Sequence, residues 1–137
     1  MFSITKEIHF CYGHRLLHHQ GKCRHLHGHN ARAVIRLEND SLDELGMVCD
    51  FSDIGRFVKD WLNREIDHNM LLHQDDPVLP LLQDAGERCY AMSENPTAEN
   101  IARLIFDAVE RAGFPVVEVA LYETESAYAS YRKSPPE

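Results

Sequence analysis

One cysteine and three histidines fall within eight residues, in the segment CRHLHGHN at 23–30. His27 and His29 stand two apart at the start of a predicted strand, so both side chains point to the same side. His14 ends the preceding segment and reaches the same point if the two strands pair through a loop at 15–26. Three neutral imidazoles are the ligand set of a catalytic zinc that keeps one position for water or substrate. We therefore predict a zinc site, the alternative being a histidine-rich surface loop.

Cys23 lies four residues before His27, between two basic residues. Neighbouring positive charge favours the thiolate form of a cysteine. The sequence leaves two roles open. As a fourth ligand, Cys23 would close the zinc site and make it structural; beside an open metal it would instead act as base or nucleophile. Two histidines followed a few residues later by a carboxylate would suggest a non-haem iron site. Ala33 and Val34 stand at those positions instead, so the sequence favours zinc and non-redox chemistry.

Two further groups carry ionisable side chains that chemistry can use. Asp67 directly precedes His68, and a histidine oriented by a carboxylate is a common general acid and base, although such neighbours often only cap a turn. Glu123 ends an otherwise apolar predicted strand. A carboxylate buried there would need a hydrogen-bonding partner, and an ordinary exposed glutamate is the alternative.

The charge of the 137-residue chain is unevenly distributed. Its formal net charge is −8, which argues against nucleic acid as a partner. Between Ile8 and Leu37, however, there is no acidic residue, while five basic residues and seven histidines fall there. This positive segment suits a small anionic ligand.

Nothing in the sequence indicates export or membrane insertion. The N-terminus lacks a basic stretch followed by an apolar run, and no run of eighteen apolar residues occurs. We expect a cytoplasmic protein without a membrane partner, whose four cysteines form no structural disulfide.

The hydrophobic pattern predicts one domain over 1–137 with a loose tail at 131–137. Apolar positions with helical spacing run from Ile54 to Leu62, with Asp50 or Ser52 as cap. A second helix is expected within 95–115, capped by Asn95 or Thr97. Strands are predicted at 2–10, 29–38, 47–51, 116–124 and 126–132. This order indicates an α+β fold in which two helices pack on one face of an antiparallel sheet, with edges that self-association would cover.

Six motifs occur in the order and spacing of the 6-pyruvoyltetrahydropterin synthase superfamily, which the chain resembles over nearly its whole length. They are HFCYGHRL, CRHLHGHN, MVCDFSDI, IDHNMLL, NPTAEN and LYETES. The short spacing between Cys23 and the His-Gly-His unit resembles the bacterial 6-carboxytetrahydropterin synthases of queuosine (7-deazapurine) biosynthesis.

The resemblance implies a fold, an assembly and a reaction. The fold is the tunnelling fold (T-fold), in which the sheets of several subunits complete a barrel, as a trimer or hexamer with active sites between subunits. The reaction converts 7,8-dihydroneopterin triphosphate into 6-carboxy-5,6,7,8-tetrahydropterin, acetaldehyde and triphosphate, with Zn²⁺ as cofactor. The implied roles are zinc binding by His14, His27 and His29, proton transfer by Cys23, Asp67 and His68, and pterin binding by Glu123 and Thr97.

One departure and two alternatives remain. Cys11 and Tyr12 stand where small residues are usual before the first zinc histidine, which reshapes the pocket floor. A 6-pyruvoyl synthase would eliminate triphosphate without cleaving the carbon chain. A structural zinc module, closed by Cys23, would have no activity.

Overall fold

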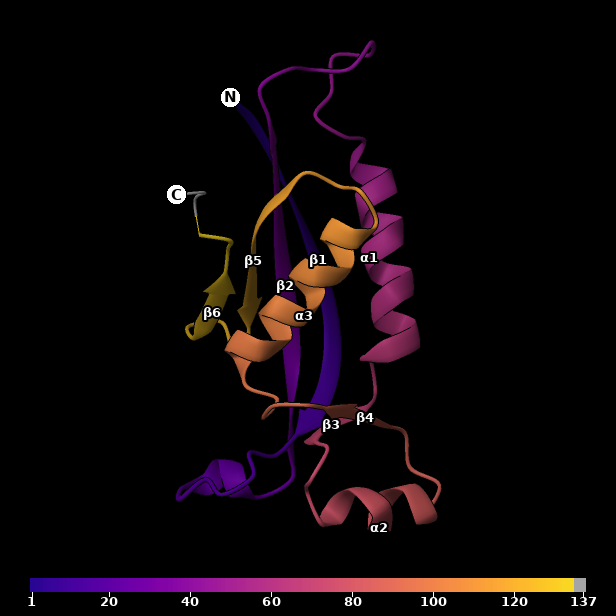
Figure 1. Ribbon diagram of the computed structural model, residues 1–137, viewed down its shortest axis with the longest axis vertical. Helices are drawn as coiled ribbons and strands as arrows, with labels where there is room; N and C mark the ends of the chain where they lie inside the picture. Colours follow the sequence, from indigo (N-terminus) through magenta and orange to yellow (C-terminus); the bar gives the residue numbers. More distant parts are fainter. Residues whose placement is uncertain (135–137) are drawn as a thin grey trace.

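The computed structural model describes residues 1–134. Figure 1 shows a long two-stranded hairpin with helices along one side and a smaller unit at its lower end. In chain order the elements are β1 (Phe2–His14), the 3-10 helix η1 (Lys22–Arg24), β2 (His27–Asn39), α1 (Phe51–Glu65), β3 (Met70–His73), α2 (Val78–Asp84), β4 (Cys89–Met92), α3 (Ala98–Arg111), β5 (Val116–Tyr122) and β6 (Tyr128–Tyr131).

The strands form one curled sheet in the order β4-β3-β1-β2-β5-β6. The hairpin of β1 and β2 pairs without interruption from Phe2 opposite Asn39 to His14 opposite His27. β5 and β6 continue the antiparallel pairing on one side. On the other side β3 and β4 join in parallel. The predicted α+β class is confirmed, but these two short parallel strands and α2 were not predicted.

The strand predicted at 47–51 is wrong. The Asp43 carboxylate accepts hydrogen bonds from the backbone of Leu45 and Met47, which holds the chain in a loop. The Asp50 side chain then accepts from Ser52 N–H and caps α1, as one of the two predicted caps. Local side-chain hydrogen bonds therefore outweigh the β propensity of this short apolar stretch.

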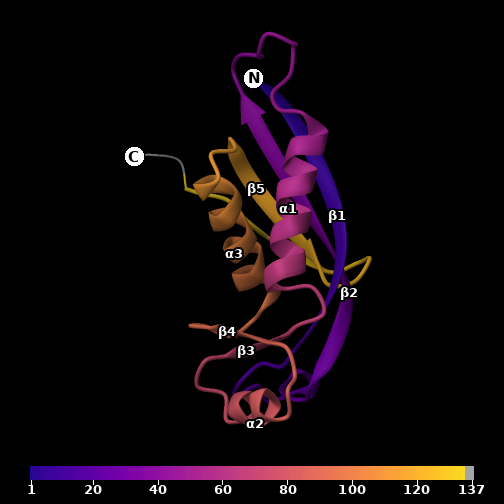
Figure 2. The same cartoon turned by 90° about the vertical axis from the view of Figure 1, so that its right-hand side faces the viewer.

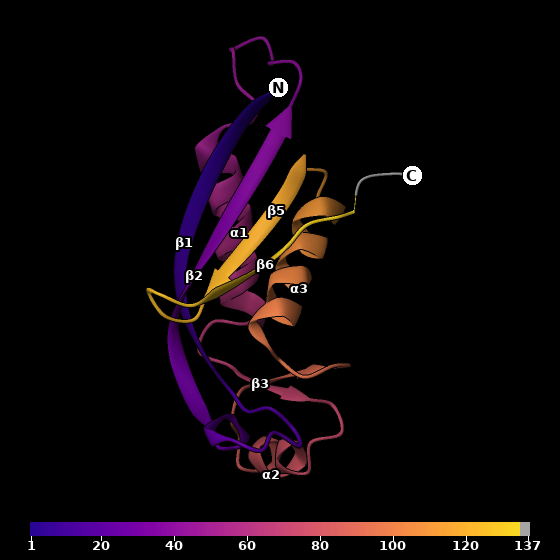
Figure 3. The same ribbon diagram turned by 90° about the vertical axis from the view of Figure 1, so that its left-hand side faces the viewer.

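Both long helices pack on one face of the sheet, as predicted (Figures 2 and 3). Their apolar faces meet the inward residues of the three long strands, among them Ile35, Leu37 and Leu121, which are fully buried. The opposite face carries alternating polar side chains, such as His9, Arg32 and Arg36, and no helix of residues 1–134 covers it. Antiparallel strands with one face buried and one open show this alternation.

Two smaller predictions concern the C-terminal end and membranes. Tyr131, the first residue of the predicted tail, is the last residue of β6 and pairs with Val119. The tail therefore begins later than expected, and residues 135–137 lie outside the described part of the chain. No helix within residues 1–134 has both the length and the apolar character that crossing a bilayer requires.

Candidate functional site

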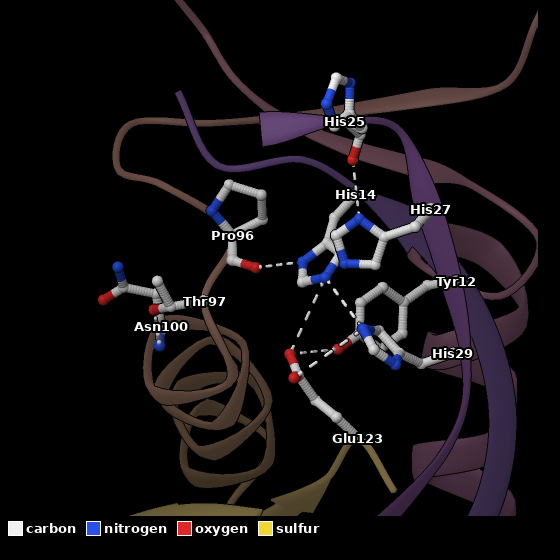
Figure 4. Close-up of polar contacts among 9 residues, drawn as sticks. All are labelled: Tyr12, His14, His25, His27, His29, Pro96, Thr97, Asn100 and Glu123. Atoms are coloured by element: carbon white, nitrogen blue, oxygen red, sulfur yellow. Dashed lines mark hydrogen bonds and ion pairs between the residues drawn. The ribbon is translucent and has the colours of Figure 1, made fainter. Parts of the chain in front are cut away.

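The hairpin brings the three predicted zinc ligands together (Figure 4). His14 ends β1 opposite His27, and His29 lies opposite Tyr12, so all four side chains share the helix-covered face. One ring nitrogen of each histidine lies within 4.8 Å of the others. The Nε2 atoms of His14 and His29 are 3.1 Å apart. His14, His27 and His29 are called the histidine group below.

Backbone carbonyls orient two of these rings. The Nδ1 atoms of His14 and His27 lie 2.7 Å from the carbonyl oxygens of Pro96 and His25. In each ring Nδ1–H donates to the carbonyl, which leaves Nε2 as the lone-pair donor. Burial lowers the pKa of His14, although the Pro96 hydrogen bond opposes this, so the ring is neutral at neutral pH.

Sequence reasoning missed the part played by Pro96. The Asn95 amide accepts from Leu17 N–H (2.8 Å) and donates to Leu17 O (3.0 Å), which ties the start of α3 to the loop after His14. This contact joins residues that are 78 positions apart, so no local sequence pattern predicts it. The capping motif around Thr97 was the only signal that this segment is ordered.

The arrangement fits a zinc ion. Ligands at about 2.1 Å from a tetrahedral zinc stand roughly 3.4 Å from each other, close to the observed 3.1 Å between the two Nε2 atoms. A neutral His14 offers a lone pair toward His29, and a shared cation satisfies both rings. One buried and two half-buried imidazoles, two of them oriented by carbonyls, form a candidate metal site.

Glu123 lies beside the histidine group, in the turn after β5. Its Oε1 is 3.9 Å from His14 Nε2, and its Oε2 is 3.8 Å from His29 Nε2. The Tyr12 hydroxyl donates to Oε1 at 3.1 Å. Tyr12 is only 3% exposed, and its ring packs against both histidines. Burial and the Glu123 carboxylate raise the pKa of Tyr12, so it remains a hydrogen-bond donor.

Thr97 serves as the N-cap of α3, where its hydroxyl accepts from Asn100 N–H at 3.2 Å. Thr97 was expected to cap the helix and, from the family resemblance, to bind the pterin, and the structure shows the capping role. Its predicted contact with a substrate stays a prediction. Because Pro96 directly precedes it, Thr97 helps to fix the carbonyl that orients His14.

The three residues predicted to transfer protons are not assembled within one chain. Cys23 lies in η1, where its carbonyl accepts from Leu16 N–H, and its thiol belongs to neither potential ligand group found in residues 1–134. Asp67 and His68 are paired at 2.8 Å, but they lie beside Cys11. Cys11 pairs with Asn30 in the hairpin, one residue out of phase with the histidine group, so its side chain points to the uncovered face.

Two hollows flank this end of the hairpin. The first, of about 660 Å³, is lined by Cys11, His29, His68 and Asn69 among others. The second, of about 710 Å³, is lined by His29 and Glu123 and by Arg32, whose guanidinium stacks over a tyrosine ring. Both are large enough for a small-molecule ligand.

The positive segment is partly neutralised in the folded chain. Arg15 forms a two-pronged hydrogen-bonded pair with Asp76, whose side chain is fully buried, and Arg32 lies 3.4 Å from Glu7. Lys22 and Arg24 of η1 have no carboxylate partner within residues 1–134. They are the basic residues of the segment best placed to meet an anion.

Comparison with known protein families shows which family the chain belongs to. The family model described as 6-pyruvoyl tetrahydropterin synthase matches residues 3–134. A Rickettsia typhi protein named 6-carboxy-5,6,7,8-tetrahydropterin synthase is 37% identical, over 93% of this chain and 98% of its own. The chain therefore belongs to the 6-pyruvoyl tetrahydropterin synthase family.

Solved structures agree on the architecture. An uncharacterised protein of Wolinella succinogenes superposes with a TM-score of 0.82 at 25% identity, covering 97% of this chain and 98% of its own. Caenorhabditis elegans 6-pyruvoyl tetrahydropterin synthase superposes with a TM-score of 0.71 at 22% identity, covering 97% and 96%. The curled half-barrel sheet with its three helices is thus the T-fold predicted from the sequence.

Proposed function

We propose that this chain is a zinc-dependent 6-carboxy-5,6,7,8-tetrahydropterin synthase, a lyase acting in the cytoplasm in queuosine biosynthesis. It converts 7,8-dihydroneopterin triphosphate into 6-carboxytetrahydropterin, acetaldehyde and triphosphate. The observation that carries the proposal is the convergence of three imidazoles, two of them fixed by carbonyls, beside a carboxylate held by a buried tyrosine. The name of the Rickettsia relative supports this substrate class.

The histidine group would hold zinc through His14, His27 and His29. Bound zinc lowers the pKa of hydroxyl groups and stabilises developing negative charge on oxygen. Around it, Glu123 would accept hydrogen bonds from the amino-pyrimidine edge of the pterin, with Thr97 nearby. Lys22 and Arg24 are suited to the triphosphate by their charge.

Proton transfer would be shared by Cys23, as thiolate base, and His68, oriented by Asp67. Burial of Asp67 is outweighed by hydrogen bonds from Cys11 and His68, which lower the pKa of this carboxyl. The carboxylate is therefore ionised and can stabilise a protonated His68.

The position of Asp67 and His68 on the uncovered face favours an active site shared between subunits. Because β4 and β6 leave the two edges of the sheet open, another copy of the chain could pair with them and bring a second subunit to this end of the hairpin. In such an assembly, a trimer or hexamer, His68 of one subunit would complete the histidine group of another.

Product analysis tests the function. Zinc-loaded protein is incubated with 7,8-dihydroneopterin triphosphate, and the products are identified by mass, with His27→Ala as control. Acetaldehyde and 6-carboxytetrahydropterin, absent with the control, are the expected result. A pyruvoyl product without acetaldehyde would establish the 6-pyruvoyl synthase activity instead. No turnover, together with a Cys23 thiol protected by metal from alkylation, would establish a structural zinc module.

A further inference from the structure

Cys11, Asp67 and His68 form a second group of potential metal ligands. One ligand atom from each lies within 4.8 Å of the other two. The group is separate from the histidine group, because Cys11 points to the uncovered face and the histidines to the covered one. Sulfur, oxygen and nitrogen together are a donor set suited to zinc and other thiophilic divalent cations.

The backbone holds these three residues in place. Asp67 Oδ1 accepts from Cys11 N–H at 2.9 Å, and His68 N–H donates to Cys11 O at 2.8 Å. His68 has a φ of 60°, in the left-handed region that residues other than glycine rarely adopt. The Arg88 guanidinium donates to the backbone oxygen of Asp67 at 3.2 Å. The two carboxylate oxygens of Asp67 contact Cys11 and His68.

There is room for an ion and further ligands. Within a single chain, the group opens on the 660 Å³ hollow, and the His68 side chain is 70% exposed. Asn69, which lines the same hollow, is 8% exposed, and its Oδ1 is a buried oxygen without a hydrogen-bond partner among the described residues. A buried oxygen in that state calls for a bound water or another ligand.

We propose that Cys11, Asp67 and His68 form a second binding site for a thiophilic divalent cation such as Zn²⁺ or Cd²⁺. The ion takes the place of the proton now shared by Asp67 Oδ2 and His68 Nδ1, which are 2.8 Å apart. A neutral His68 keeps its ring proton by moving it from Nδ1 to Nε2, while the thiol proton of Cys11 passes to solvent, so binding releases one proton. Water completes the coordination from the open hollow.

Occupation of this site has a consequence that depends on the proposed function. A cation on Asp67 and His68 removes the pair that would move protons during the reaction. Zinc in excess of the histidine group therefore inhibits the enzyme, whereas the first zinc activates it.

Cadmium titration of the assembled, chelator-stripped protein tests the site. Cd²⁺ bound to a thiolate absorbs in the ultraviolet, which reports the sulfur ligand without any need for turnover. The wild type is expected to bind two ions per chain, one for each ligand group, and to show the thiolate band. Cys11→Ser should bind one ion without the band, and the matched control Cys23→Ser should keep both ions and the band.

Three results would overturn the proposal: one ion per chain in the wild type, a band that persists in Cys11→Ser, or a band lost only in Cys23→Ser. The double variant His27→Ala/His29→Ala isolates the second site and should still bind one ion with the band. Turnover assays then separate the two hypotheses. If cadmium binding behaves as described and the protein lacks turnover, the proposed function fails while the cation site holds.

Discussion

The histidine group and the Cys11 group lie at the same end of one hairpin, on opposite faces of the sheet. On the covered face His14 is 3% exposed, and the carbonyls of Pro96 and His25 orient two of the three rings. On the uncovered face His68 is largely exposed and is oriented by its neighbour Asp67. One chain therefore brings the three imidazoles together by itself, whereas the groups proposed to transfer protons lie on the other side of the sheet and, in the proposed function, meet a substrate only beside a second subunit.

The largest effect is expected from breaking the covered side with His27→Ala. Loss of one of three ligands should remove bound zinc and abolish turnover, because two imidazoles no longer hold the ion against water. Metal content per chain and product formation are the measurements. His25→Ala is the matched control, since His25 contacts His27 through its backbone oxygen alone. Equal loss of zinc in both variants would contradict the assignment.

The next effect comes from the uncovered side. His68→Asn should lower turnover by about 10²–10⁴-fold, the usual contribution of a general acid or base. Zinc at the histidine group should stay unchanged. Asparagine tolerates the left-handed backbone at this position, so folding is preserved.

Mixing two inactive variants shows whether the faces cooperate across subunits. His27→Ala and His68→Asn chains, unfolded and refolded together, should regain turnover, because some sites then combine an intact histidine group with an intact Asp67–His68 pair. Separate refolding followed by mixing is the control. If co-refolding restores nothing, the two groups act within one chain and the shared-site interpretation is wrong.

The covered side was largely predictable because its geometry is local to one hairpin. His27 and His29 alternate along a single strand, and His14 lies directly opposite His27, so strand periodicity and pairing suffice to place them. The helices followed from apolar spacing in the same way. The strands β3 and β4 were missed because each is four residues long and pairs in parallel with distant segments.

The arrangement on the uncovered side could not be predicted, because its contacts join residues that are far apart in the sequence. Cys11 meets Asp67 across 56 residues, through the crossing of α1 and the return of β3 beside β1. The family resemblance instead grouped Asp67 and His68 with Cys23, which lies in η1. Tyr12 was noticed as an unusual residue, but its bond to Glu123 spans 111 positions and has no local signal.

Stability at the hairpin end should depend on the pair between Arg15 and Asp76. Arg15→Gln leaves a fully buried carboxylate without its cation and should lower the free energy of unfolding by about 3 kcal/mol. Chemical denaturation measures this, with the exposed Arg24→Gln as control. If Arg15→Gln lowers the free energy of unfolding by no more than Arg24→Gln does, the pair does not stabilise the fold.

The pair between Arg15 and Asp76 also makes the stability of the fold depend on pH. The Arg15 hydrogen bond lowers the pKa of Asp76, and burial opposes it. The carboxylate therefore stabilises the fold above its unfolded pKa of about 3.9, and this contribution is lost as pH falls through the lower folded pKa. Without Arg15 the loss begins at higher pH, so acid unfolding of Arg15→Gln should have a raised midpoint.

The smallest effect is expected from Tyr12→Phe, which removes the hydrogen bond to Glu123. The ring still packs on His14 and His29, so zinc content should not change. The lost hydroxyl donor to Glu123 should cost about 1 kcal/mol of stability and raise KM several-fold, because the carboxylate is less well fixed for a substrate. If Tyr12 acts through Glu123, Tyr12→Phe should raise KM no further in a Glu123→Gln background. Additive effects would mean that the tyrosine acts on the pocket directly.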